Sequence, residues 1–200
     1  MVRLVTLEKA AWGPAAEPLF LEFVNSLHWD DGIPMEELED AAALAAWCAA
    51  RELPAEGREG ELGALRSLRE HARAIVERLA TGRPLVLADL QAIGQVLGGP
   101  TGRLSFMGGN SGQPSLCFEP EPGHDGGVAF RVALSLTQFL VAGEHGRLKL
   151  CANPGCGYAF LDFSTNRTRR WCDMSGCGNR QKVRSFRRRR TLGPVRRGRS

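Results

Sequence analysis

Two cysteine pairs in the last quarter of the chain set the strongest limit on how it folds. Cys151 and Cys156 are followed, after 15 intervening residues, by Cys172 and Cys177, so each pair encloses four residues. A glycine stands just before the second cysteine of each pair and permits the tight turn that directs two sulfurs at one point. Because this stretch contains no histidine, the pattern predicts one closed, structural zinc site with four cysteine ligands. Redox sensing by the same thiols is the alternative.

The segment between and after the cysteines is expected to complete a treble-clef-like zinc finger. Residues 157–163 alternate like a strand whose aromatic side chains pack around the metal, and residues 169–171 are expected to return as its partner strand. A helix is expected over residues 175–190, with Asp173 as its N-cap. Because so short a segment cannot bury enough apolar surface alone, zinc is expected to supply much of its folding free energy.

The charges of the chain divide at the same place. Residues 151–200 hold thirteen basic residues and two acidic ones, whereas residues 1–150 hold thirteen basic and twenty acidic ones. The net charges are therefore +11 and −7, although the whole chain carries only +4. A strongly cationic segment beside an acidic body predicts a polyanionic partner, with nucleic acid the first candidate. A merely solubilising or disordered tail is the alternative.

The predicted C-terminal helix is expected to enter the DNA major groove. Val183 and Phe186 lie on one side and predict an apolar stripe that docks the helix on the zinc module. Asn179, Arg180 and Arg184 are candidates for reading bases, because asparagine pairs well with adenine and arginine with guanine. A structural role is equally open, in which Asn179 braces the zinc knuckle and Arg180 pairs with an aspartate, Asp162 or Asp173. The arginine run 187–190 is expected to bind phosphates. The remaining candidate DNA contacts are basic side chains: Arg169, Arg170, Lys182, Arg187 and Arg188.

Residues 1–146 are expected to form a mainly helical domain with one small β-hairpin. Apolar residues at helical spacing predict helices over residues 18–29, 35–53, 60–80, 85–97 and 128–143. Segments 102–107 and 114–118, which flank a glycine-rich turn, predict the hairpin. The arginines and glutamates of the 60–80 helix are expected to form a solvated face. Asn25 and His28, which interrupt the first apolar helix, are either hydrogen-bonded structural groups or part of a ligand pocket.

Several classes of protein are excluded by these patterns. No window approaches 18 uncharged apolar residues, so no membrane-spanning helix is expected. The N-terminal residues lack the apolar stretch of a secretory signal, so we expect a cytoplasmic protein. A glycine-rich phosphate loop and a nucleophile–base pair are not recognisable, so an enzyme is not expected. The predicted fold class is α+β, with a helical domain over 1–146, a zinc finger over 147–191 and a flexible basic tail over 192–200.

The cysteine segment resembles a known family. The cysteine spacing, the Trp171-Cys172 pair and the run Cys177-Gly178-Asn179-Arg180 are similar to those of the CGNR zinc finger. In that family the finger follows an ABATE domain, and the stretch LEFVNSL at 21–27 is similar to the Asp-Phe-Val-Asn-Thr type motif near the start of that domain, with Glu22 where Asp is common. The resemblance implies a bacterial transcription regulator, linked to stress, with a zinc-bound DNA-binding finger. It also implies an ABATE domain that senses or binds a ligand.

Three functions therefore compete. A DNA-binding regulator leads, with an acidic helical domain that senses an unknown small-molecule effector or mediates association. An RNA-binding zinc protein is the second, because arginine-rich helices also suit RNA. A protein-interaction module, with the cationic helix on an acidic protein surface, is the third. A single finger offers a contact area below about 1,000 Å², so a homodimer formed through the helical domain would strengthen DNA binding.

Overall fold

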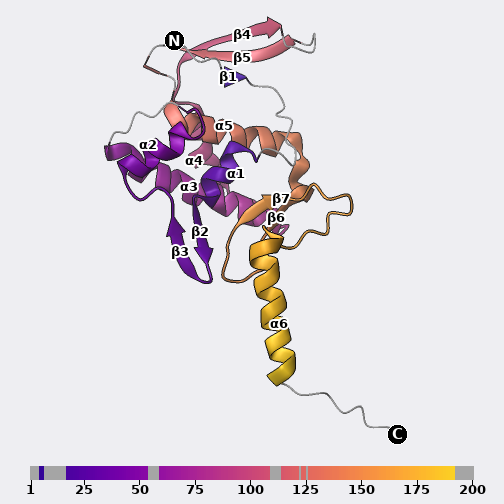
Figure 1. Ribbon diagram of the computed structural model, residues 1–200. Helices are drawn as coiled ribbons and strands as arrows, with labels where there is room; N and C mark the ends of the chain where they lie inside the picture. The colour runs from indigo at the N-terminus through magenta and orange to yellow at the C-terminus, as the bar shows by residue number, and fades with distance from the viewer. Residues whose placement is uncertain are drawn as a thin grey trace.

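The computed structural model describes residues 5–6, 17–53, 59–108, 114–121, 123–124 and 126–191. Helices occupy the centre of the molecule, a small antiparallel sheet lies at one end, and a long C-terminal helix projects from the other (Figure 1). The predicted α+β class is confirmed, with helices and short antiparallel strand pairs together. Within the described part of the chain, no helix is long and apolar enough to cross a bilayer.

Helix α1 (Leu19–Asn25) forms the centre of the hydrophobic core. Its apolar residues Phe20, Leu21, Phe23 and Val24 are fully buried, and Glu22 between them is partly exposed and pairs with Arg51. The ring of Phe20 packs on that of Phe139, with ring centroids 5.0 Å apart. The helix is therefore enclosed by its neighbours, and these include α5 (Gly127–Ala142) and α3 (Glu59–Ala80).

A β-hairpin lies where the sequence predicts the end of one helix and the start of the next. Strands β2 (Leu27–Asp30) and β3 (Ile33–Glu36) pair antiparallel, with Leu27 opposite Glu36. Asp31 and Gly32 both adopt positive φ at the turn, which is the conformation that an Asp-Gly hairpin turn requires. The helix predicted over 18–29 therefore ends at Asn25. The helix predicted over 35–53 is α2 (Ala41–Ala49), and Asp40 caps it by accepting a hydrogen bond from the Ala43 amide at 2.8 Å.

The other helices and the larger hairpin agree with the sequence pattern. Helices α3, α4 (Leu87–Leu97) and α5 match the ranges predicted from apolar periodicity. Strands β4 (Gly102–Gly108) and β5 (Pro114–Pro120) form the predicted hairpin, and β1 (Val5–Thr6) joins its edge beside β5.

The arginines of α3 do not form the solvated face that the sequence predicts. Arg69 is only 4% exposed and binds the carboxylate of Glu36 and the hydroxyl of Ser26. Arg73 donates to the carbonyl of Val24 at 2.6 Å and to that of Leu27, where α1 has ended. The last carbonyls of a helix lack partners within it, and the guanidinium of Arg73 satisfies that of Val24. The arginines of α3 thus hold α1 and the β2–β3 hairpin in place.

The strands on either side of the first cysteine pair enter the same core. Strand β6 (Leu148–Leu150) pairs antiparallel with β7 (Ala159–Leu161), and residues 169–171, the predicted partner of β7, are not a strand. Leu148, Ala159 and Leu161 belong to the core cluster that surrounds α1. The division of the chain at 146/147 remains a prediction, and the apolar core extends across it.

Candidate metal centre and nucleic-acid interface

The four predicted ligands meet at one point. The sulfur atoms of Cys151, Cys156, Cys172 and Cys177 all lie within 4.8 Å of one another. Two of the separations are 3.6 Å, from Cys156 to Cys172, and 3.7 Å, from Cys172 to Cys177. Four sulfurs at about 2.3 Å from one tetrahedral zinc ion lie about 3.8 Å apart, so these sulfurs are spaced as zinc requires.

Two pieces of backbone carry the ligands. The first pair sits on the turn between β6 and β7, which the bond from the Cys151 amide to the Tyr158 carbonyl, at 2.8 Å, closes. Of the second pair, Cys172 precedes a short π-helical turn (Met174–Gly178) and Cys177 lies within it, and the turn continues directly into α6 (Asn179–Thr191). Asp173 caps this turn as predicted, because its carboxylate accepts hydrogen bonds from the Ser175 and Gly176 amides. A knuckle between β6 and β7 and the start of α6 thus face each other across the metal position, whereas the predicted finger had its hairpin between residues 157–163 and 169–171.

The chemistry of the cluster also fits a metal cation. Burial raises the pKa of Cys156 to about 11, and burial together with the nearby sulfurs raises the pKa of Cys172. Four thiolates so close together repel one another unless a dication neutralises them. The amide of Asn153 lies 3.5 Å from the sulfur of Cys177 and donates to it, which suits a ligating thiolate. Because the set consists of four cysteine sulfurs and no oxygen or nitrogen ligand joins it from the part of the chain that the structure describes, the residues fit a closed structural zinc site.

The β2–β3 hairpin braces the zinc knuckle from the helical side. The amide of Trp29 donates to the carbonyl of Cys156 at 2.9 Å, and that of Gly32 donates to the carbonyl of Gly155 at 3.1 Å. Gly157, at φ +64°, lies against the indole of Trp29, where a Cβ atom would come within 2.5 Å of the ring. A larger residue at position 157 would therefore force the hairpin and the knuckle apart.

A buried carboxylate fixes the loop between the two cysteine pairs. Asp162 is fully buried and accepts hydrogen bonds from the ammonium of Lys149 at 2.7 Å, the amide and hydroxyl of Ser164, and the amide of Arg169. Although burial opposes ionisation, these donors hold the pKa of Asp162 well below its usual range. Asp162 and Asp173 were the two aspartates considered as partners of Arg180; Lys149 pairs with Asp162, and Asp173 binds Ser175 and Gly176.

Arg180 and Arg184 point toward the helical domain instead. Arg180 forms an ion pair with Asp30, and Arg184 forms one with Asp31, so both meet the tip of the β2–β3 hairpin. Arg184 also donates to the side chain of Asn153, at 3.1 Å. These contacts correspond to the structural role that the sequence left open for Arg180.

Helix α6 projects from the rest of the molecule (Figure 1). Val183 and Phe186 are 49% and 60% exposed, so the prediction that they dock on the zinc module is wrong. The helix is directed by the turn at Cys177 and by the hairpin, and its apolar stripe faces solvent. Among the predicted contacts on α6, five are exposed: Asn179, Lys182, Arg184, Arg187 and Arg188.

The two basic residues before Cys172 differ in their surroundings. Arg169 donates to the carbonyls of Trp171 and Cys172, and its guanidinium lies 4.5 Å from the ring centroid of Phe160. Arg170 is exposed and lies 5.3 Å from the ring centroid of Trp171. Arg169 thus supports the loop before the second cysteine pair, whereas Arg170 is accessible beside α6.

Asn25 and His28 connect α1 to the finger. The side-chain amide of Asn25 donates to the Ala159 carbonyl at 2.8 Å and accepts from the Ala159 amide at 2.9 Å. His28 lies edge-on to Tyr158, with ring centroids 5.9 Å apart, and its Nδ1 lies 3.1 Å from the Asn25 carbonyl. The polar atoms of Asn25 therefore hold β7. Of the two roles considered from the sequence, a structural group or part of a ligand pocket, these contacts correspond to the structural one.

Sequence analysis missed two sets of residues at this site. The hairpin tip, Asp30 and Asp31, was not recognised as a partner of α6, although the Asp31-Gly32 dipeptide is a hairpin signal. The buried Lys149–Asp162 pair was missed because no local motif links its two members.

Comparison with known families agrees with this geometry. A model described as "CGNR zinc finger" matches residues 147–190, which include all four cysteines. The ABATE model, described as "Putative stress-induced transcription regulator", matches residues 17–143, more than half of the chain. No curated protein shows a significant match. The chain therefore belongs to the ABATE family, and a CGNR zinc finger with one structural zinc site follows its ABATE domain.

Proposed function

We propose that this protein is a DNA-binding transcription regulator whose zinc finger presents α6 to the DNA. The observation that carries the proposal is the position of α6, which projects from the zinc node and exposes basic side chains to solvent (Figure 1). Its thirteen residues, 179–191, contain seven basic residues and no acidic one. A helix of this length extends for about 20 Å, which is enough to lie in a major groove.

The basic residues are proposed to act in two groups. The exposed cations Arg170, Lys182, Arg187, Arg188 and Arg190 are proposed to bind phosphates, which fixes the position of the helix without reading sequence. Arg180 and Arg184 are proposed as positioning residues, because the aspartates of the hairpin tip engage both. Asn179 is proposed as a DNA contact at the start of the helix, where its side chain is exposed.

The ABATE domain is proposed to sense a signal in the cytoplasm and to pass it to the finger. The shared core and the hairpin contacts support this role, since a change in the helical domain would move β7, the knuckle and α6 together. Its effector is proposed to be a small molecule, and a homodimer through the same domain would double the DNA contact area.

The test is binding of the zinc-loaded full chain to duplex DNA over a range of salt concentrations. About five neutralised phosphates give a log–log slope of roughly −4 to −5. The triple variant Arg187→Ala, Arg188→Ala, Arg190→Ala should flatten the slope by about three. The matched variant Arg78→Ala, Arg83→Ala, Arg103→Ala changes the net charge equally on other elements and should leave the slope unchanged.

Two results would overturn the proposal. A flat slope would remove DNA as the partner and favour a protein-interaction module. Preference for structured RNA over every duplex in a random-sequence selection would favour an RNA-binding protein, for which an arginine-rich helix is equally suited.

A further inference from the structure

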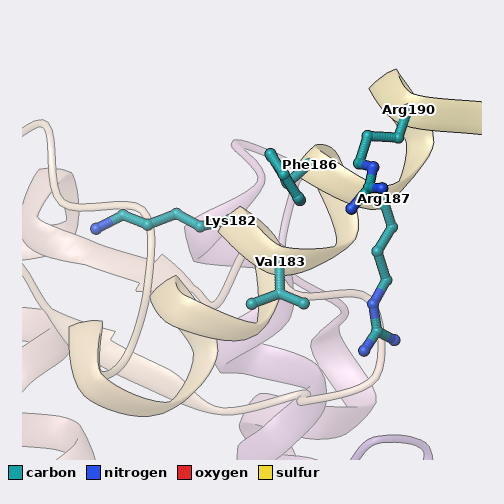
Figure 2. A pocket seen from close by; sticks show the side chains of 5 residues that line it. All are labelled: Lys182, Val183, Phe186, Arg187 and Arg190. Carbon is teal, nitrogen blue, oxygen red and sulfur yellow. The ribbon is translucent and has the colours of Figure 1, made fainter. Parts of the chain in front are cut away.

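The two sides of α6 have different surroundings. Arg180 and Arg184, one turn apart, face the acidic hairpin tip. A shallow groove runs along another side of the helix (Figure 2). We call this side the groove face, and its members recur at helical spacing: Lys182, Val183, Phe186, Arg187 and Arg190.

The groove face combines apolar and cationic groups in an exposed position. Val183 and Phe186 leave about half or more of their area in water, on a helix that extends away from the core. The guanidinium of Arg190 lies 5.7 Å from the ring centroid of Phe186 and does not cover it. Neighbouring apolar side chains that stay exposed on a projecting helix mark a surface that contacts a partner.

Charge complementarity identifies the kind of partner. Three of the five members of the groove face are cations, so a second copy of α6 would bring like charges together. The residues that follow α6 along the chain, 192–200, include three arginines and no acid, and the same repulsion opposes them. An occupant must therefore be anionic and must also offer apolar groups between its charges.

The major groove of DNA has both properties. Its phosphates line the edges, and thymine, through its C5-methyl group, is the base that presents an apolar group inside. A helix that lies in this groove places its central side chains on the bases and its flanking cations on the phosphates.

We propose that the groove face is the side of α6 that enters the major groove, and that Val183 and Phe186 contact the C5-methyl groups of thymines there. Lys182, Arg187 and Arg190 bind the phosphates on either side. This inference rests on the DNA-binding function proposed above and names the sequence feature that the finger reads. Arg180 and Arg184 hold a neighbouring side of the helix against the hairpin and set its direction.

The test replaces thymine by deoxyuridine, which lacks the methyl group and keeps the hydrogen-bonding edge. A preferred duplex is first selected from a random library with the zinc-loaded full chain. Removing a methyl group under the groove face should weaken binding by about fourfold, since burying one such group is worth roughly 0.8 kcal/mol. The same replacement outside the contacted positions should have no effect.

The variant Val183→Ala, Phe186→Ala should bind thymine and deoxyuridine duplexes equally. Because both side chains are exposed, the variant should keep its zinc content and its circular dichroism. Val141→Ala is the matched control, since Val141 is 83% exposed on α5, and it should keep the full sensitivity to the methyl group.

The outcomes separate the two proposals. If the wild-type chain binds no duplex, the proposed function fails and this inference fails with it. If the chain binds duplexes with a steep salt dependence but ignores deoxyuridine at every position, the inference is wrong and the function stands. Unchanged methyl sensitivity in the double variant would also overturn the inference, because other residues would then make the contact.

Discussion

Two helices of this protein are rich in arginine, and they use it in opposite ways. In α3 the arginines turn inward, where Arg69 pairs with Glu36 and Arg73 binds the carbonyls at the end of α1. In α6 the side chains of Arg187, Arg188 and Arg190 are exposed to solvent. Both sequences carry arginine at helical spacing, so the side chains alone do not explain the difference.

The surroundings of each helix explain it. Helix α3 lies beneath the end of α1 and the β2–β3 hairpin, which supply unpaired carbonyls and a carboxylate. In the first turns of helix α6, Arg180 and Arg184 meet such acceptors at Asp30, Asp31 and Asn153, and the helix then projects from the body of the protein (Figure 1). An arginine thus becomes structural where the fold brings an acceptor to it and stays available to a partner where the fold does not.

Removing zinc should have the largest effect on stability, because the metal site fixes the direction of α6. Cys172→Ser should lose the metal and unfold the finger, since structural zinc contributes about 10 kcal/mol or more to such a module. Because Leu148, Ala159 and Leu161 lie in the shared core, the helical domain should also lose several kcal/mol of stability. Zinc analysis and urea denaturation followed by circular dichroism measure both effects.

Cys117→Ser is the control for this variant, because Cys117 is buried in β5 and lies outside the cluster. It should keep the metal and lose only about 1–2 kcal/mol. If chelation left the unfolding curve of the helices unchanged, the core would not be shared between the domain and the finger.

Arg69→Ala tests directly whether the buried arginines of α3 stabilise the fold. Breaking a buried ion pair leaves Glu36 uncompensated, so we expect a loss of about 3–5 kcal/mol in the free energy of unfolding. The same change at Arg187, exposed on α6, should cost less than about 0.5 kcal/mol. Urea denaturation of the two variants at pH 7 makes the comparison, and equal losses would contradict it.

The pH dependence of the Arg69 effect follows from Glu36. Burial acts to raise the pKa of this carboxyl, but its hydrogen bonds to Arg69 outweigh burial and lower it. A lowered pKa gives stability that is present above the unfolded value of about 4.3 and is lost as the pH falls through the folded value. The difference between wild type and Arg69→Ala should therefore narrow below about pH 4, and a constant difference would assign the loss to packing alone.

The parts of the fold that sequence could predict are those encoded over short distances. Helices α3, α4 and α5 follow from apolar periodicity, and the zinc site follows from ligand spacing, because both patterns are local. The first two helices were predicted too long, because apolar Leu27 and Trp29 continue the periodicity of α1 although they belong to β2. The Asp31-Gly32 turn was the signal that should have stopped the prediction.

The contacts that direct α6 could not be predicted in the same way. Asp30 and Arg180 are 150 positions apart, and their pairing depends on how the whole core places the hairpin against the knuckle. The predicted partner of β7, residues 169–171, was wrong for a related reason. The true partner, β6, precedes the first cysteine and is only three residues long, which is too short for a recognisable strand pattern. The charge and the apolar periodicity of a helix can be determined from its sequence, but the elements that pack against it determine which of its sides faces solvent.

The smallest effect on stability should come from removing the ion pairs that hold the first turns of α6 against the hairpin. Asp30→Asn with Asp31→Asn removes two exposed ion pairs, so the free energy of unfolding should fall by less than about 1 kcal/mol. The variant Glu37→Gln, Glu39→Gln removes the same charge from exposed residues after β3 and is the control. If Arg180 and Arg184 only position the helix, both variants should bind DNA with the same log–log salt slope. A slope steeper by about two in the aspartate variant alone would mean that both arginines reach phosphates once freed, and that the hairpin competes with DNA for them.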